Sequence, residues 1–73
     1  MKTIRVIPRA LHQMADDTKE CVKVLKDAGI DAQAARQSDQ GWWAIWIYED
    51  GDFQRALAML HNLKLPVVDG NSN

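Results

Sequence analysis

The side chains most capable of chemistry are three carboxylates that cluster around one glycine. Glu49, Asp50 and Asp52 flank Gly51, and carboxylate oxygens are ligands that Mg²⁺ and Ca²⁺ prefer. The segment lacks the ligand series and the closing glutamate of a calcium-binding loop. Asp52 stands directly before a segment with helical periodicity, so turn formation and helix capping account for these acids. The sequence therefore predicts no metal site and no cofactor.

Cysteine and histidine, which could act as nucleophile or base, are isolated in this chain. Cys21 is the only cysteine, and it lies on the apolar stripe of an expected helix with no histidine beside it. His12 and His61 are far apart, and no nucleophile motif surrounds either one. The four glycines are scattered rather than grouped to cradle a phosphate. We expect a buried Cys21, no catalytic residue and no enzymatic activity.

Aromatic side chains give the sharpest functional signal. Residues 42–49 read WWAIWIYE, which is typical of a strand, and alternate residues of a strand point to opposite faces. One face would carry Trp43, Ile45 and Ile47, and the other Trp42, Ala44, Trp46 and Tyr48. Both faces are therefore apolar, although helices packed on one side of a sheet cover only one of them.

The isoleucines of this strand are in phase with Ile4 and Val6, which suits the face beneath the helices. That choice leaves Trp42, Trp46 and Tyr48 on the open face, with Arg5 beside them, and we predict these four as the partner-binding residues. Exposed aromatic patches usually contact another protein or a second copy of the same chain. Two alternatives stay open. Leu11, Met14 or the C-terminal tail could cover this face, or the two faces could be reversed.

Nucleic-acid binding is a second interpretation of the same face. RNA-recognition motifs use this strand order and stack bases on aromatics of the third strand. Here Gln40 stands in the basic position of that motif, Trp43 in the small position and Ala44 in a stacking position. The net charge of −1, from nine basic and ten acidic residues, gives no general attraction to phosphates. The pattern disfavours nucleic acid relative to a protein partner or homodimer.

Local patterning also predicts the elements that position these residues. Residues 3–8 (TIRVIP) alternate like a strand that Pro8 ends, and residues 9–16 form a connection with room for a short helical turn. A helix should begin at Asp17, which forms a capping-box pattern with Glu20.

This helix should end at Gly29, with Ile30 packing back against it. Residues 31–37 (DAQAARQ) alternate as a second strand, and residues 38–41 (SDQG) have turn composition. Together with the aromatic strand they predict a hairpin.

The last third of the chain predicts a second helix and a short strand. Asp52 can cap a helix whose Phe53, Ala56, Leu57, Leu60 and Leu63 follow the helical period. Pro66 ends it, residues 67–68 form a possible edge strand, and residues 69–73 form a frayed tail. The order β-α-β-β-α(-β) predicts an α+β, ferredoxin-like domain with an antiparallel sheet, two helices on one face, and the first and third strands in the centre.

Length and composition fit one domain spanning residues 1–73. A chain this short buries only about 60 to 65% of its unfolded surface, so self-association would add stability. It has no apolar stretch of the length a signal peptide or membrane span needs. With a single cysteine, these features predict a reducing, cytoplasmic setting and no membrane association.

Two stretches resemble a known family. They are residues 21–32 (CVKVLKDAGIDA) and residues 43–57 (WAIWIYEDGDFQRAL). The chain is similar to small prokaryotic signal-transducing domains of unknown function, and to the cytoplasmic domain that precedes some bacterial rhomboid proteases. The resemblance spans roughly residues 4–63 and implies a small ferredoxin-like or nitrogen-regulator-like module without established catalytic residues. The tryptophans at 42, 43 and 46 depart from the family pattern, and a phage-encoded inhibitor of a host protein is a further alternative.

Overall fold

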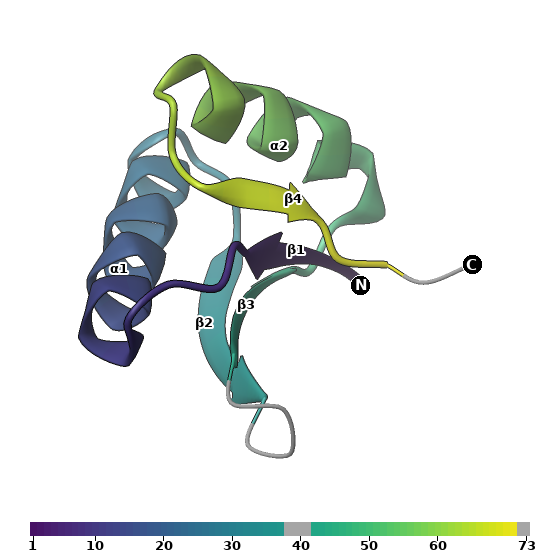
Figure 1. Cartoon of the computed structure of the whole chain (residues 1–73). Coiled ribbons are helices and arrows are strands. Elements are labelled where there is room, and N and C mark those ends of the chain that lie inside the picture. Colours follow the sequence, from purple (N-terminus) through teal and green to yellow (C-terminus); the bar gives the residue numbers. More distant parts are fainter. Residues whose placement is uncertain (38–41, 72–73) are drawn as a thin grey trace.

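The computed structural model describes residues 1–37 and 42–71, with the side chains of all of these except Leu11, Gln37 and Trp42. Along the chain the elements follow the order β-α-β-β-α-β (Figure 1). The strands are β1 (Lys2–Val6), β2 (Ala32–Gln37), β3 (Trp42–Ile47) and β4 (Val67–Asp69). The helices are α1 (Leu11–Asp27) and α2 (Phe53–Asn62), with a short 3-10 turn at Asp50–Asp52 before α2. The turn predicted over residues 38–41 lies outside the described residues.

The strands form one antiparallel sheet in the order β2-β3-β1-β4. The first and third strands occupy the centre, as predicted. Both helices lie on one side of this twisted sheet (Figure 1). The α+β, ferredoxin-like prediction is therefore confirmed, including its final strand, which extends by one residue to Asp69.

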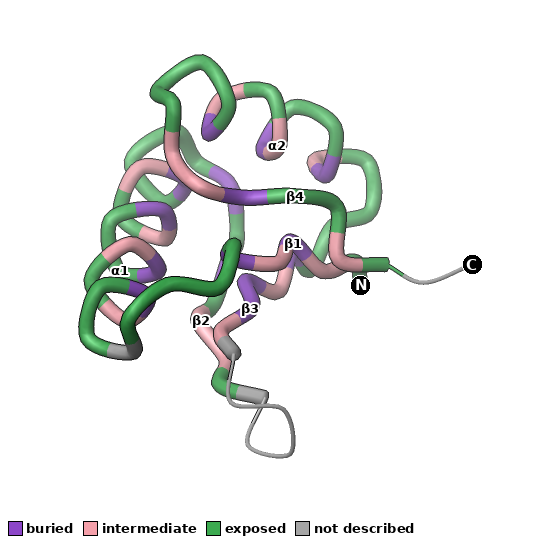
Figure 2. The backbone as a smooth tube through the Cα atoms, in the orientation of Figure 1, coloured by how far each residue is buried: buried purple, intermediate pink, exposed green. Residues whose placement is uncertain are grey.

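The core fills the space between the helices and one face of the sheet. Ile4 of β1 lies opposite Ile45 of β3, both are fully buried, and Ile47 beside them is equally inaccessible. The helices contribute Met14, Cys21, Leu25, Phe53, Ala56 and Leu60. Figure 2 shows these buried positions on the inner sides of both helices. The isoleucines thus lie beneath the helices, as predicted, and Met14 joins the core instead of covering the opposite face.

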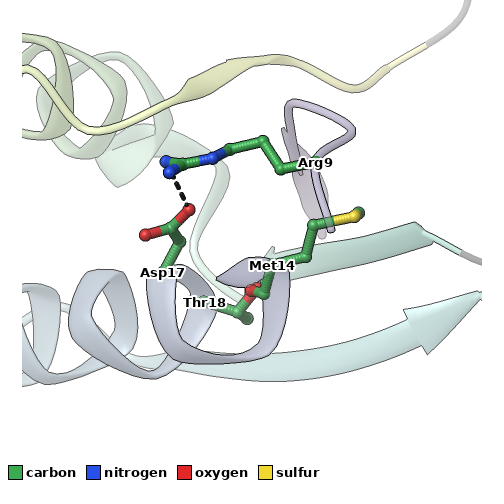
Figure 3. Close-up of polar contacts among 4 residues, drawn as sticks. All are labelled: Arg9, Met14, Asp17 and Thr18. Atoms are coloured by element: carbon green, nitrogen blue, oxygen red, sulfur yellow. Dashed lines mark hydrogen bonds and ion pairs between the residues drawn. The ribbon is translucent and has the colours of Figure 1, made fainter. Parts of the chain in front are cut away.

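Helix α1 begins at Leu11, so the predicted start at Asp17 is wrong. The buried side of α1 includes Thr18, a polar residue that interrupts the apolar spacing visible in the sequence. Its hydroxyl donates to the carbonyl oxygen of Met14 at 2.6 Å, so it is buried without an unsatisfied group. Asp17 does not cap the helix and instead pairs with Arg9, with 3.0 Å between Oδ2 and Nη1 (Figure 3).

The predicted end of α1 is confirmed in detail. Gly29 has a φ of 81°, and its N–H donates to the carbonyl of Lys26 at 2.9 Å. The N–H of Ile30 donates to the carbonyl of Leu25, also at 2.9 Å. These two bonds form the Schellman motif, in which a left-handed residue lets the chain turn back and seal the helix end.

The C-terminal segment continues along β1. The N–H of Gly70 donates to the carbonyl of Thr3 at 3.0 Å, and the Thr3 N–H donates to Oδ1 of Asn71 at 2.8 Å. Asn71 donates its own N–H and its side-chain amide to Oδ1 of Asp69, which lowers the pKa of that carboxyl. Residues 69–71, expected as part of a frayed tail, are thus bonded to β1, and residues 72–73 lie outside the described residues.

Candidate interaction surface

The sheet face opposite the helices carries the predicted partner-binding residues, and we call it the open face. Strand alternation and pairing register define its described side chains as Thr3, Arg5, Ile7, Gln33, Ala35, Ala44, Trp46, Tyr48 and Val68. It combines exposed apolar groups with a polar border. Ile7 is 40% exposed, Tyr48 39% and Val68 42%.

Trp46 is held in the middle of the open face by β3. Its neighbours across the sheet are Thr3 of β1 on one side and Gln33 of β2 on the other. The side chain is half-buried. Tyr48 stands two residues further along the chain, and its hydroxyl donates to Oε1 of Gln33. Trp46 and Tyr48 thus lie next to each other on one face, as alternation predicts, with Gln33 as a shared neighbour.

Arg5 lies in the next row of the same face. It is opposite Ala44 of β3 and Val68 of β4, and it is half-buried. Ala44 is fully buried although it is outside the core, so larger neighbouring side chains close over it. Arg5 and Trp46 are diagonal neighbours across this alanine, a spacing that long side chains can bridge. The centre of the open face is therefore filled rather than hollow.

Trp43 and Trp46 occupy different surroundings. Trp42 begins β3, and its side chain is outside the described set, so only its backbone pairing with Gln37 is given. Trp43 has the opposite orientation to Trp46 and packs, half-buried, against the core on the helix side. Of the predicted site residues, the structure therefore brings Trp46, Tyr48 and Arg5 together on one face.

Electrostatically the open face is weakly charged. Among its described side chains Arg5 is the single ionised group, since the others are apolar or neutral polar. Other cations near β1 are directed elsewhere. Lys2 lies over the Phe53 ring, 5.4 Å from its centroid, on the helix side, and Arg9 pairs with Asp17. A weakly charged, partly apolar surface suits contacts with protein better than contacts with a phosphate backbone.

The acids around Gly51 take part in local ion pairs. The Met1 amino group lies 2.8 Å from Oδ1 of Asp50, and that hydrogen bond and charge lower the pKa of Asp50. Asp52 directly precedes α2, as predicted, but makes no capping bond with its side chain and lies 3.7 Å from Arg55. Within residues 1–37 and 42–71 no cluster of histidine, cysteine or acidic side chains has the arrangement to hold a metal ion.

Two further side chains that could take part in chemistry, Cys21 and His61, make structural contacts instead. Cys21 is fully buried in the core, and burial together with the charges of Asp17 and Glu20 raises its pKa to about 12. A thiol with so high a pKa is protonated at neutral pH and is a poor nucleophile. Nε2 of His61 lies 3.0 Å from the carbonyl oxygen of Val67, linking α2 to β4.

Three residues of the open face were not named by the sequence reasoning: Gln33, Ala35 and Val68. Strand alternation alone places Gln33 and Thr3 on one face or the other, but their position beside Trp46 depends on register. Val68 lies beside Arg5 because β4 pairs with β1. The strand order expected for a ferredoxin-like domain contained this signal, since it makes β4 the neighbour of β1.

Comparisons with protein-family models, with curated proteins and with solved structures find no match for this chain. Among the described residues no helix combines the length and apolar character that crossing a membrane requires.

Proposed function

We propose that the chain is a small, non-catalytic interaction or regulatory module that binds a protein partner through its open face. The observation that carries this proposal is the grouping of Trp46, Tyr48 and Arg5 on the sheet face opposite the helices, beside exposed Ile7 and Val68. Tyrosine, tryptophan and arginine contribute a disproportionate share of interface energy. The flanking Thr3 and Gln33 give this apolar centre the polar border that is typical of interfaces.

The resemblance to prokaryotic signal-transducing domains supports the same type of function. Regulatory modules of that kind act by contact, and the open face is a surface on which such contact is favourable. A cytoplasmic setting fits the single, buried Cys21. An inhibitor of a host protein would use the open face in the same way.

The test is affinity capture from cell extract with matched variants, quantified by mass spectrometry. Trp46→Ala and Tyr48→Ala remove the aromatic groups of the open face. Leu63→Ala is the control, because Leu63 is 56% exposed and directly follows α2, away from the open face. We expect proteins that the wild type enriches to be lost with the first two variants and retained with the control. An identical set of captured proteins with all variants, each verified as folded by circular dichroism, would contradict the proposal.

Single-stranded nucleic acid is the competing ligand. The observation in its favour is the diagonal placement of Arg5 and Trp46, which could stack and pair with one nucleotide. Anisotropy with labelled mixed oligonucleotides at low salt separates the two functions, since electrostatic binding is strongest there. We expect no binding. If the oligonucleotides bind and Trp46→Ala abolishes that binding, the ligand of the open face is nucleic acid and not a protein.

A further inference from the structure

Strand β2 forms an unusually unprotected edge of the sheet. It pairs with β3 over its whole length in one continuous register, from Ala32 opposite Ile47 to Gln37 opposite Trp42. Its sequence, AQAARQ, contains no proline, lysine or acid, and its single charge is that of the exposed Arg36 near the C-terminal end of the strand. Native edge strands usually carry such residues, a bulge or a short length, which prevent pairing with other chains. The opposite edge has this protection, because β4 is three residues long and follows Pro66.

The direction of each peptide group on β2 follows from one hydrogen bond. The N–H of Tyr48 donates to the carbonyl of Asp31 at 3.3 Å, which continues the ladder between β3 and β2. Antiparallel pairing alternates, so the peptide groups of Gln33 and Ala35 also face β3. The residues whose N–H and C=O point outward are Ala32, Ala34 and Arg36. In the described part of the chain no strand pairs with this outer edge.

We propose that β2 pairs with β2 of a second copy of this chain, antiparallel, about a two-fold axis at Ala34. In this register Ala34 lies opposite Ala34 of the second copy. Ala32 of each copy lies opposite Arg36 of the other copy. All the paired residues have outward-pointing peptide groups, so each pair exchanges two hydrogen bonds. In this register the charged Arg36 of each copy lies opposite the small Ala32 of the other copy and not opposite a like charge.

A second copy suits this edge better than a head-to-tail arrangement. Pairing β2 with itself is isologous and closes at a dimer, whereas pairing β2 with β4 of another copy would leave free edges and continue into a filament. The short β4 also offers fewer pairing positions than β2. The two-fold axis stands perpendicular to the sheet, so both open faces lie on the same side of one continuous sheet. The dimer does not depend on what the open face binds.

The first measurement is light scattering coupled to size exclusion over a concentration series, combined with amide hydrogen exchange. We expect the mass to double from the 8.3 kDa of one chain as concentration rises. The amides of Ala34 and Arg36 should exchange fast at low concentration and slowly in the dimer. The amides of Gln33 and Ala35 bond to β3 and should be protected at every concentration. A chain that stays monomeric throughout the series overturns the proposal.

Proline variants identify the interface. Ala34→Pro removes an outward N–H and leaves the bonds to β3, so it should give a folded monomer, whereas Ala34→Ser keeps that N–H and should keep the dimer. Arg36→Pro, with Arg36→Ala as its control, repeats the test at an exposed position should Ala34→Pro fail to fold. A dimer that persists in the folded proline variants, or that Trp46→Ala abolishes instead, overturns the β2 interface.

Discussion

The hydroxyl of Tyr48 donates a hydrogen bond to Oε1 of Gln33, which ties the residue after β3 to the edge strand β2 on the open face. Tyr48→Phe removes this bond but keeps the ring. Because both groups are exposed, the free energy of unfolding should fall by no more than about 1 kcal/mol. Partner binding should be retained, since the aromatic surface remains. Urea denaturation and affinity capture measure the two effects.

Tyr48→Ala is the variant to compare with Tyr48→Phe, because it removes both the ring and the hydroxyl. Loss of the captured proteins with alanine but not with phenylalanine would locate the interaction in the ring. Equal loss with both variants would contradict this and assign the role to the hydroxyl and its bond to Gln33.

The fold was predictable because strong local signals agree with its topology. Gly29 followed by Ile30 fixed the end of α1 correctly, and alternation placed Ile45 and Ile47 beneath the helices. The start of α1 was not predictable in the same way. Ala10 precedes the helix without a side-chain cap, and the buried Thr18 is a polar residue whose hydroxyl bonds within the helix. Neither the uncapped start of α1 nor the burial of Thr18 can be predicted from apolar periodicity or from capping rules.

The open face was predictable only as a set of residues. Alternation places Trp46 and Tyr48 on one side of β3, and the strand order expected for the fold brings Arg5 near them. Their actual neighbours depend on register, because a shift by one residue exchanges the two faces of a strand. The burial of Ala44 depends on how the surrounding side chains pack, and this information is not contained in local spacing.

The end of α2 offers a stabilising substitution. Lys64 has a φ of 59°, and its N–H donates to the carbonyl of His61 at 2.9 Å. The N–H of Leu65 donates to Leu60 at 3.0 Å, so this is the same motif that ends α1, with lysine in the place of glycine. A residue with a Cβ is strained in this conformation by about 1 kcal/mol.

Lys64→Gly should therefore raise the free energy of unfolding by about 0.5 to 1 kcal/mol, since greater freedom in the unfolded chain offsets part of the relieved strain. Lys64→Ala keeps the Cβ and should bring no comparable gain. Gly29→Ala is the converse change. Among the described residues that are not its immediate neighbours in the chain, none has an atom within 4 Å of the added Cβ, so its expected loss of about 1 kcal/mol comes from backbone strain. Thermal and urea unfolding test all three, and a destabilised Lys64→Gly would contradict this account.

The buried thiol of Cys21 makes stability depend on pH in the alkaline range. Its pKa rises from 9.0 to about 12 on folding, chiefly because burial disfavours the thiolate. The unfolded chain therefore loses this proton at lower pH than the folded one. The stabilising contribution is complete below about pH 9 and is lost as the pH rises toward 12, with a slope of up to about 1.4 kcal/mol per pH unit.

Cys21→Ala serves as the reference for this effect, because the two proteins share every other ionisable group. The difference in unfolding free energy between wild type and variant should shrink as the pH rises above about 9. The native thiol should also react with an alkylating reagent only as fast as the protein opens. A difference that is constant with pH, together with rapid alkylation of the folded protein, would show that Cys21 is accessible.

Gly70 tests whether the C-terminal segment is a fixed part of the sheet. A Cβ at this position would lie 3.0 Å from the backbone nitrogen of Arg5 and 3.2 Å from the carbonyl oxygen of Thr3. These backbone atoms belong to the central strand β1 and cannot move aside easily. Gly70→Ala should therefore displace residues 70 and 71 from β1 and lower the free energy of unfolding by about 1 kcal/mol.

Asn71→Ala provides an independent change at the same contact, because it removes the acceptor that the Thr3 N–H uses at 2.8 Å. With either variant the Thr3 amide should exchange faster with solvent, while the amide of Ile4, which faces β3 in the alternating ladder, should be unaffected. If the segment were frayed in solution, both variants would match the wild type in stability and in exchange at Thr3. That result would mean that residues 70 and 71 are not part of the folded domain. On the β4 side, Arg5 would then be bordered by Val68 alone.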